Sequence, residues 1–241
     1  MRIAGPRVGG PCESPTLTQA PTPSALRFDL IVFDWDGTLF DSTALIARCI
    51  QSACSDLGIA VPTDAQASYV IGMGLSEALQ HAAPELPRER YRELAERYRH
   101  HYFERQHEIV FFDGTLPMLQ ALKARGHLLG VATGKSRRGL DEALGTSVLQ
   151  GLFDATRTAD ETASKPDPRM LVELMQEFDV APERTVMIGD TTHDLQLAAN
   201  AGTASIGVSY GAHDHSTFSV FDTSFVAHST AELHDWLLRH G

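Results

Sequence analysis

Short apolar runs alternate with helical patterns along most of the chain. The run from Phe28 to Phe33 ends at the polar Asp34 and predicts a buried strand. Further short apolar runs predict strands over 127–132, 185–188 and 204–208, and a weaker pattern indicates a strand over 153–156. Apolar residues three and four positions apart predict helices over 116–125, 136–144, 167–178, 192–201 and 231–239. Strands that alternate with helices favour an α/β fold around a parallel sheet.

One long segment breaks this alternation. Residues 43–110 hold helical patterns and give no strand signal. Ile46 and Ile50 lie on the apolar stripe of a first helix, which follows the first strand directly. More helix is expected over 65–83, with a break at 72–74, and over 87–107. The segment is therefore predicted to be an all-helical insertion after the first strand.

The first 26 residues have no apolar period and few large side chains. Residues 1–27 hold five of the 12 prolines, with three arginines and one glutamate. The formal charge of the whole chain is −11, so the rest of the chain carries −13. Such a segment buries too little surface to offset its ordering entropy. We expect 1–26 to be a disordered extension, or the product of a start codon placed too far upstream.

Composition restricts the classes of function. A net charge of −11 argues against general nucleic-acid or anionic-membrane binding, which needs clustered positive charge. No apolar run approaches the ~18 residues of a membrane span, and the first residues lack the apolar centre of a secretory signal. The three cysteines, Cys12, Cys49 and Cys54, form no disulfide or metal-binding pattern. We therefore expect a cytoplasmic protein without nucleic-acid or membrane partners. The sequence leaves both a monomer and a homodimer open.

Four polar clusters follow the ends of predicted strands. They are the run Asp-Trp-Asp-Gly-Thr-Leu-Phe-Asp over 34–41, Thr133-Gly134, Lys165-Pro166, and the run Gly-Asp-Thr-Thr-His-Asp over 189–194. Ligands bind at the carboxyl edge of open parallel sheets. The four clusters are therefore expected to form one site.

The first cluster carries two carboxylates that can share one reaction. Asp34 and Asp36 are two residues apart, so on an extended segment both side chains point the same way. One carboxylate can attack phosphorus, and the second can protonate the leaving oxygen and then activate water. A polar strand end followed by a turn, or a calcium loop, would explain Asp-x-Asp-Gly alone. The longer string after an apolar strand is much more specific.

The last cluster offers ligands for a hard cation. Asp190 stands at a predicted strand end, and Asp194 lies one turn into the next helix. Together with Asp34 these oxygens suit Mg²⁺, which screens a carboxylate from a substrate phosphate. The alternative is that Asp194 or Thr192 only caps the helix. His193 is expected to face solvent or to pack, not to bind a metal.

The two remaining clusters could bind a phosphate group. Lys165 is one of three lysines, and Pro166 favours an extended backbone that aims its side chain. Thr133 and Gly134 offer a hydroxyl and backbone N–H groups at a helix N-terminus. Lys135 could add charge there, although a surface role is an alternative of at least the same weight. Alone, each of these two clusters is a weak signal, and the four clusters together are a strong one.

These four clusters, in this order, resemble the four motifs of the haloacid dehalogenase-like hydrolase superfamily. The helical insertion resembles the α-helical cap of that superfamily, and the chain is similar to its phosphoglycolate phosphatase-like enzymes. The resemblance covers roughly residues 28–230. It implies a Rossmann-like parallel sheet core over 27–42 and 111–241, with an inserted all-α cap domain over 43–110.

The resemblance implies a role for each of the catalytic residues. Asp34 would be the nucleophile and Asp36 the general acid and base. Thr133 and Lys165 would bind the phosphoryl group, and Lys165 would also neutralise Asp34. The dehalogenating relatives lack an Asp at the position of Asp36, so its presence favours phosphate chemistry.

The resemblance also implies a metal site. Asp34, Asp190 and the backbone carbonyl of Asp36 would bind Mg²⁺. Asp194 would hold that site as a ligand or by supporting one.

The predicted cap says less about the substrate. Gly72 begins a Gly-Met-Gly-Leu run where the family often has a specificity loop, and Gly134 could bind substrate with it. A plain helix break explains the glycines equally well. Four basic residues of the cap could meet a substrate carboxylate or remain solvated charges, namely Arg48, His81, Arg88 and Arg92.

The expected function is a Mg²⁺-dependent phosphomonoesterase. It would hydrolyse a small phosphorylated, phosphoglycolate-like metabolite through an aspartyl-phosphate under a mobile helical lid. The alternatives are a phosphomutase or phosphotransferase, a pyrophosphatase, or a non-catalytic regulatory member of the same superfamily.

Overall fold

The computed structural model describes Met1, residues 27–145 and residues 148–241. The predicted extension over 1–26 and Cys12 therefore lie outside the described residues, apart from Met1. Six strands form one sheet in the order β5-β4-β1-β6-β7-β8, and all neighbouring strands are parallel. They are β1 (Leu30–Phe33), β4 (Leu128–Thr133), β5 (Ala155–Thr158), β6 (Thr185–Gly189), β7 (Ala204–Val208) and β8 (Phe225–Ala227). The predicted α/β fold with a parallel sheet is confirmed.

Strand β1 lies in the middle of the sheet, between β4 and β6. The chain builds β4 and β5 on one side of β1 and then crosses to build β6, β7 and β8 on the other. The strand order therefore reverses beside β1, and the crevice at such a point is the usual ligand site of a parallel sheet. Asp34 follows the last residue of β1 directly.

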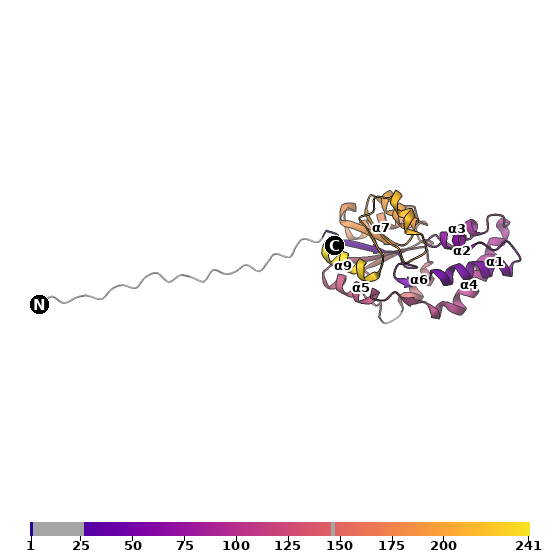
Figure 1. Cartoon of the computed structure of the whole chain (residues 1–241), viewed down its shortest axis with the longest axis horizontal. Helices are drawn as coiled ribbons and strands as arrows, with labels where there is room; N and C mark the ends of the chain where they lie inside the picture. Colours follow the sequence, from indigo (N-terminus) through magenta and orange to yellow (C-terminus); the bar gives the residue numbers. More distant parts are fainter. Residues whose placement is uncertain (2–26, 146–147) are drawn as a thin grey trace.

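Helices cover both faces of the sheet (Figure 1). Leu30 and Val32 pack with α7 (Arg169–Phe178) and α8 (Thr192–Ala201) on one face. Ile31 and Phe33 pack on the opposite face, in the cluster that includes residues of α5 (Thr115–Ala124), α6 (Arg137–Leu144) and α9 (Thr230–His240). Since both faces of β1 are buried, its sequence is a continuous apolar run instead of an alternating one.

Four helices form a second body beside the sheet (Figure 1). They are α1 (Thr43–Asp56), α2 (Asp64–Tyr69), α3 (Leu75–Ala82) and α4 (Tyr91–Arg105), and they enclose an apolar cluster of their own. We call this body the helical insertion. The short strands β2 (Phe40–Asp41) and β3 (Val110–Phe111) pair antiparallel where the chain leaves the core and returns to it. Both crossings between the two bodies therefore lie side by side.

The remaining elements are short, and the sequence pattern did not predict most of them. Strands β2, β3 and β8 have two or three residues, too few to show a period of two. The 3₁₀ helices are η1 (Arg88–Arg90), η2 (Gln106–Glu108), η3 (Pro182–Arg184) and η4 (His215–Val220). The helix predicted over 167–178 begins at Arg169, and Pro168 is its N-cap. Within the described parts of the chain, no helix has the length and apolar character that crossing a membrane needs.

His127 is buried just before β4. Its Nδ1 donates to the carbonyl oxygen of Phe28 at 2.9 Å, and its Nε2 has no hydrogen-bond partner. Burial lowers the pKa of His127, because a protonated ring would bring a charge into apolar surroundings. The folded protein therefore holds this ring neutral.

Replacing His127 by Gln is expected to make the stability of the protein less dependent on pH. The unfolded chain protonates this ring below about pH 6.5, whereas the folded chain resists it, so folding stability falls as the pH falls. The slope of the free energy of unfolding against pH should be smaller in the variant than in the wild type, by up to about 1.4 kcal/mol per pH unit. Urea titrations between about pH 5 and pH 7.5 measure this slope. His107→Gln, at an exposed position, is the control, and a wild-type slope in His127→Gln would contradict the prediction.

Candidate active site

Asp34 is buried at the carboxyl end of β1. Its backbone N–H donates to the carbonyl oxygen of Ile188 at 2.8 Å, which extends the pairing of β1 with β6. Its Oδ1 lies 2.5 Å from Nζ of Lys165, and its Oδ2 has no hydrogen-bond partner. Burial raises the pKa of Asp34, the Lys165 ammonium opposes this shift, and the neighbouring Asp194 and Asp190 add to it. One carboxylate oxygen of Asp34 is therefore fixed and the other is free to react or to bind.

Lys165 is fully buried between two carboxylates. Its Nζ lies 2.5 Å from Asp34 Oδ1 and 2.6 Å from Asp194 Oδ1. Burial alone would lower the pKa of Lys165, but Asp194 and Asp34 outweigh burial and raise it. The ammonium therefore stays charged and neutralises part of the acidic site. The peptide bond to Pro166 is cis.

Asp194 has two roles at the start of α8. Its Oδ2 accepts hydrogen bonds from the backbone N–H of Thr191 at 3.1 Å and from the Thr191 hydroxyl at 2.7 Å, completing a capping box. Its Oδ1 holds Lys165. Asp194 therefore takes part in capping α8, although the N-cap itself is Thr191, so the alternative that Thr192 caps the helix is wrong. The part of Asp194 in a metal site stays a prediction.

Asp190 follows β6 and is held from two sides. Thr38 donates its hydroxyl to Oδ1 at 2.9 Å, and the backbone N–H of Ala212 donates to Oδ2 at 2.7 Å. Burial raises the pKa of Asp190 to about 7, and the nearby Asp194 adds to the shift. Thr38 belongs to the motif over 34–41, but the sequence alone did not predict a role for it.

The carboxylates of Asp34, Asp190 and Asp194 form a compact acidic triad. Each offers an oxygen within 4.8 Å of the others. Gly37 and Gly211 pack against Asp190 so closely that a Cβ on either would overlap its carboxylate. The glycines leave room for this triad, and Asp34 adds a buried oxygen without a partner. An all-oxygen set of this kind fits a hard divalent cation such as Mg²⁺.

Asp36 holds its carboxylate between Ser42 and Lys135. Ser42 donates its hydroxyl to Asp36 Oδ1 at 2.7 Å, and Lys135 Nζ lies 3.0 Å from Asp36 Oδ2. The side chain is therefore outside the group of possible metal ligands. The predicted metal contact through the backbone carbonyl of Asp36 stays a prediction.

Lys135 connects the core with the helical insertion. Its side chain is only 12% exposed, so the surface alternative for this residue is wrong. Its Nζ donates to the hydroxyl of Tyr102 on α4 at 2.9 Å and also contacts Asp36. Burial would lower the pKa of Lys135, but Asp36 and Tyr102 outweigh burial and raise it. The sequence did not reveal this role because Tyr102 lies in a different body of the fold.

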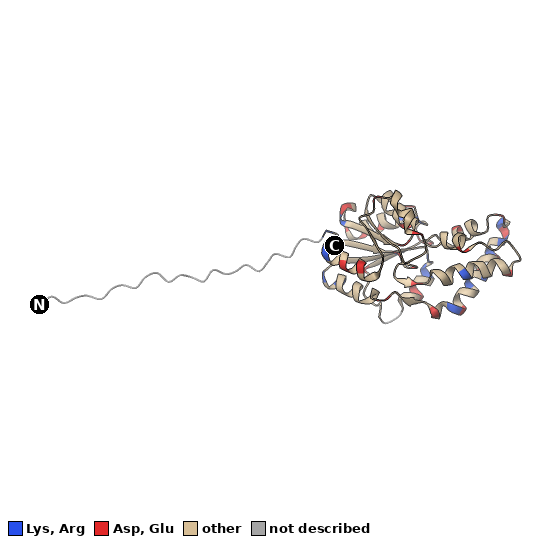
Figure 2. Cartoon of the chain, in the orientation of Figure 1, with Lys and Arg blue, Asp and Glu red and all other residues tan. Residues whose placement is uncertain are grey.

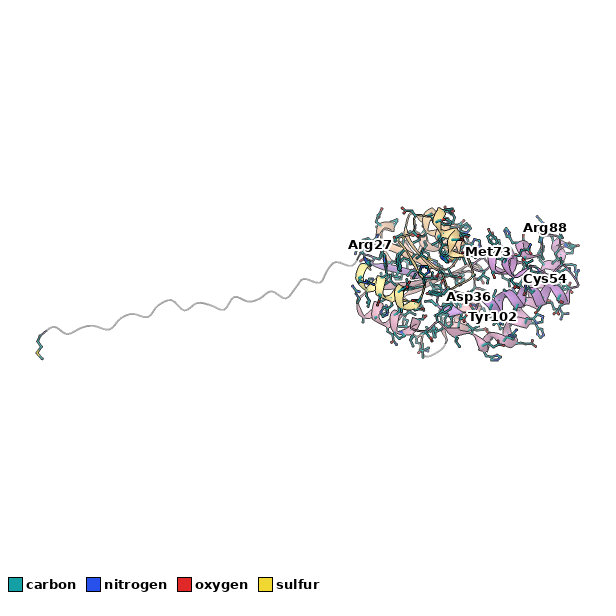
Figure 3. The ribbon with its side chains drawn as sticks, viewed as in Figure 1. Arg27, Asp36, Cys54, Met73, Arg88 and Tyr102 are labelled. Atoms are coloured by element: carbon teal, nitrogen blue, oxygen red, sulfur yellow. The ribbon has the colours of Figure 1, made fainter. Side chains whose placement is uncertain are left out.

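The loop between α2 and α3 rests on the core beside Thr133. Gly134 lies against the backbone carbonyls of Gly72 and Met73, and a Cβ there would overlap both. The N–H of Gly74 donates to the hydroxyl of Ser164 at 2.9 Å. Figure 3 shows Met73 with Asp36 and Tyr102 at the junction of the two bodies. The candidate substrate residues Gly72, Thr133 and Gly134 are therefore neighbours.

Two histidines hold the end of α2 against the core. Nε2 of His193 and Nε2 of His213 lie 2.8 Å and 3.0 Å from the carbonyl oxygen of Tyr69, and both donate to it. His213 Nδ1 accepts from the N–H of Thr192 at 3.1 Å. His193 is thus a packing residue, one of its two expected roles. His213 had no recognisable signal, because its partner lies 144 residues away.

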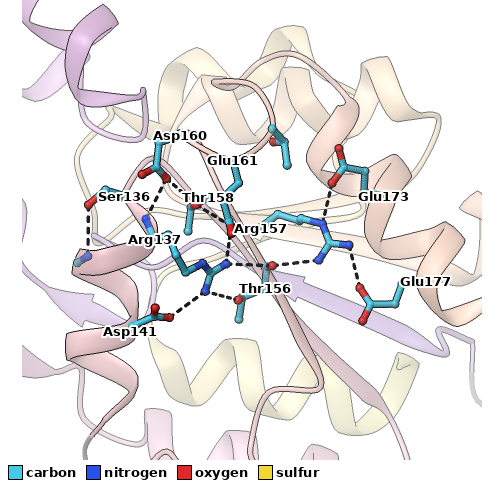
Figure 4. Close-up of polar contacts among 12 residues, drawn as sticks. Ser136, Arg137, Asp141, Thr156, Arg157, Thr158, Asp160, Glu161, Glu173 and Glu177 are labelled. Atoms are coloured by element: carbon cyan, nitrogen blue, oxygen red, sulfur yellow. Dashed lines mark hydrogen bonds and ion pairs between the residues drawn. The ribbon is translucent and has the colours of Figure 1, made fainter.

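An ion-pair network supports the loop that leads to Lys165 (Figure 4). Ser136 caps α6, and the backbone N–H of Arg137 donates to Asp160 at 2.9 Å. The Arg137 guanidinium binds Glu161 at 2.7 Å and Asp141 at 3.1 Å. The network joins the start of α6 to the segment after β5, so the predicted phosphate-binding clusters are fixed relative to each other.

A cavity of about 510 Å³ lies between the two bodies. Its core side includes Asp34, Asp36 and Thr133, and its insertion side includes Ile50 and Tyr98. The basic residues Arg48, His81, Arg88 and Arg92 are exposed and do not line it. Figure 3 places Arg88 at the end of the insertion away from the core.

Replacing Gly134 by Ala is expected to impair turnover more than folding. The added methyl would push against the carbonyl of Met73 and displace the insertion from the core. We expect kcat/KM for a phosphomonoester to fall by about tenfold or more, since small misplacements at a reaction centre are costly. Gly145→Ala, where the nearest atoms lie 3.4 Å from the new Cβ, is the matched control. Equal turnover by the two variants would contradict a role for this close contact.

Comparison with known proteins identifies the family. The model of the haloacid dehalogenase-like hydrolase family matches residues 31–208. A phosphoglycolate phosphatase of Vibrio vulnificus is 31% identical over 219 residues, which cover 87% of this chain and 96% of that protein. The pyrophosphatase PpaX of Bacillus cereus is 27% identical, with coverage of 86% and 95%.

Solved structures agree with the sequence relatives. A haloacid dehalogenase-like hydrolase from Bacteroides fragilis superposes with a TM-score of 0.79 at 26% identity. The match covers 86% of this chain and 99% of that one. The chain therefore belongs to the haloacid dehalogenase-like hydrolase family, and within that family it is a phosphatase.

Proposed function

We propose that this phosphatase is a Mg²⁺-dependent phosphomonoesterase that works through an aspartyl-phosphate. The observation that carries this proposal is the buried Asp34 carboxylate, which has one oxygen bound to Lys165 and the other unpartnered. It stands where the strand order of the sheet reverses, at the wall of the cavity between the two bodies. A carboxylate in this setting is well placed to act as a nucleophile.

The first step transfers the phosphoryl group to Asp34. Its free Oδ2 attacks phosphorus, the bond from phosphorus to the leaving oxygen breaks, and Asp36 gives that oxygen a proton. Thr133, Gly134 and Lys165 bind the phosphoryl oxygens. Ser42 and Lys135 hold the Asp36 carboxyl in position for this transfer.

The second step regenerates the enzyme. Asp36 takes a proton from a water molecule, whose oxygen attacks phosphorus and displaces Asp34 as a carboxylate. Residues 43–110 act as a cap that closes over the site during the first transfer and admits water when open. The paired β2 and β3 strands, through which both connections pass, support such a motion.

Asp34, Asp190 and Asp194 would hold Mg²⁺, with the backbone carbonyl of Asp36. When bound, the ion supplies positive charge that screens the acidic triad from the anionic substrate. The all-oxygen donor set and the glycines packed against Asp190 support this assignment.

The substrate is a small phosphorylated metabolite. A phosphoglycolate-like compound is one candidate, supported by the Vibrio relative, and inorganic pyrophosphate is a second, supported by the Bacillus relative. A phosphomutase or phosphotransferase would use the same Asp34 chemistry with a hydroxyl in place of water. We further propose a cytoplasmic location, with which the free buried thiols of Cys49 and Cys54 agree.

Phosphate release from a panel of phosphomonoesters and pyrophosphate tests this function. We expect turnover with Mg²⁺, its loss after chelation, and its return when Mg²⁺ is added back. Turnover that survives complete chelation would contradict the metal requirement. A product that is an isomer of the substrate, without free phosphate, would identify a mutase.

A further inference from the structure

We propose that the leaving group of the physiological substrate is a neutral alcohol bearing an apolar ring, not a small carboxylate. This inference rests on the proposed phosphomonoesterase function and concerns the cavity beside Asp34. It follows from the volume of the cavity, the chemistry of its walls and the positions of its charged residues.

The cavity is large for a two-carbon acid. Its volume of about 510 Å³ falls within the ~300–1,000 Å³ that is typical of sites for drug-sized ligands. Phosphorylated glycolate would leave most of this space to water. A substrate that fills the cavity needs a body of ring size beyond the phosphate.

The wall opposite the reaction centre is apolar. Ile46, Ile50, Val70 and Ile71 line the cavity and belong to the apolar cluster of the helical insertion. They come from α1 and from the end of α2 with the loop after it. These side chains have no group that can form a hydrogen bond, so burying an apolar ring against them is favourable by the hydrophobic effect.

Aromatic side chains complete this wall. Tyr98 and Tyr102 line the cavity from α4, with ring centroids 5.9 Å apart and nearly parallel planes. Flat walls of this kind favour a planar or cyclic group, because aromatic pairs gain energy beyond their buried area. Burial raises the pKa of both tyrosines, so they stay neutral.

The charged residues on the cavity wall do not suit a substrate carboxylate. Lys135 is the buried ammonium on this wall, and it is already engaged by Asp36 and Tyr102. Arg99 is exposed to solvent, and the acidic Glu77 lines the same cavity. A carboxylate against the apolar wall would lose hydration without gaining a buried cation that is still free among the described residues, which is unfavourable.

The third cation on the wall is Arg138. Arg138 pairs with Glu142 at 3.0 Å, and both lie towards solvent. Figure 2 shows charges of both signs along α4 and the outer end of the insertion. The apolar wall of the cavity therefore favours neutral over anionic leaving groups.

The test compares three alkyl phosphates whose alcohols have similar leaving ability, namely 2-phenylethyl phosphate, ethyl phosphate and 2-phosphoglycolate. We expect kcat/KM with Mg²⁺ to be at least about tenfold higher for 2-phenylethyl phosphate than for the other two, the scale of a well-filled apolar pocket. A preference for 2-phosphoglycolate would overturn this inference and leave the proposed function intact. Absence of turnover with every phosphomonoester would contradict the proposed function itself.

Two variants locate the preference in the cavity. Tyr98→Ala should lower kcat/KM for 2-phenylethyl phosphate by about tenfold, while turnover of ethyl phosphate shows that the variant still folds. Arg99→Gln should leave the order of the three substrates unchanged, with the exposed Arg97→Gln on the same helix as the control. The contrary result has two parts: the wild type prefers 2-phosphoglycolate, and Arg99→Gln loses turnover of that compound alone. Together they would show that the cavity binds carboxylates instead.

Discussion

Replacing Asp34 by Asn is expected to reduce phosphate release by at least about 1,000-fold, because the amide oxygen is a poor nucleophile. The substitution keeps the size of the side chain and an oxygen that can accept from Lys165. It removes the negative charge and the oxygen that has no partner in the folded protein. The loss should therefore appear in kcat, measured as phosphate released at saturating substrate and Mg²⁺.

The same variant should remain folded. Asp34 is one of three neighbouring carboxylates, so the substitution removes repulsion, and Lys165 keeps its partner Asp194. We expect a thermal midpoint without added metal within about 2 °C of the wild type or above it. Asp235→Asn, an exposed position on α9, is the control for the chemical change. Turnover within tenfold of the wild type would contradict the role of Asp34, and a collapse of the midpoint would assign the loss to unfolding.

The sequence could predict the core of the site because strand ends determine where its residues lie. Asp34 and Lys165 are 131 positions apart, yet each follows a strand of the same parallel sheet. Parallel strands bring their carboxyl ends to one edge. The clusters after β1, β4, β5 and β6 could therefore be expected to meet without any knowledge of their contacts.

The contacts between the two bodies could not be predicted from strand ends in this way. Lys135 follows a strand like the other site residues, but its burial depends on Tyr102 of α4. The packing of His193 and His213 depends in the same way on the Tyr69 carbonyl. No periodicity encodes how an inserted body docks on a sheet, so these roles appear only in three dimensions.

The apolar wall of the cavity also could not be predicted from the sequence pattern. Ile46 and Ile50 fit the helical period that marks a core-facing stripe, and both are indeed buried in α1. The same period describes a side chain that packs against protein and one that lines a cavity. The expectation of a phosphoglycolate-like substrate therefore came from the resemblance, whereas the chemistry of the wall required the assembled structure.

Lys165→Met is expected to destabilise the protein strongly as well as to abolish turnover. Lys165 is completely buried, and its ammonium contacts Asp34 and Asp194 at 2.5 Å and 2.6 Å. Methionine fills much of the same space but leaves these carboxylates buried without a cation. Breaking a buried ion pair from one side costs about 3–5 kcal/mol. Urea denaturation without added metal measures the loss in the free energy of unfolding.

The chain contains a matched control in Lys123→Met. Lys123 pairs with Asp154 at 2.7 Å, but both side chains are about a quarter exposed, so this loss should stay below about 1 kcal/mol. Mg²⁺ should raise the thermal midpoint of Lys165→Met more than that of the wild type, because the acidic triad has then lost its competing ammonium. Equal destabilisation by the two lysine variants would contradict the charge balance inferred for the site. A midpoint of Lys165→Met that does not respond to Mg²⁺ would show that Asp34, Asp190 and Asp194 do not hold the ion.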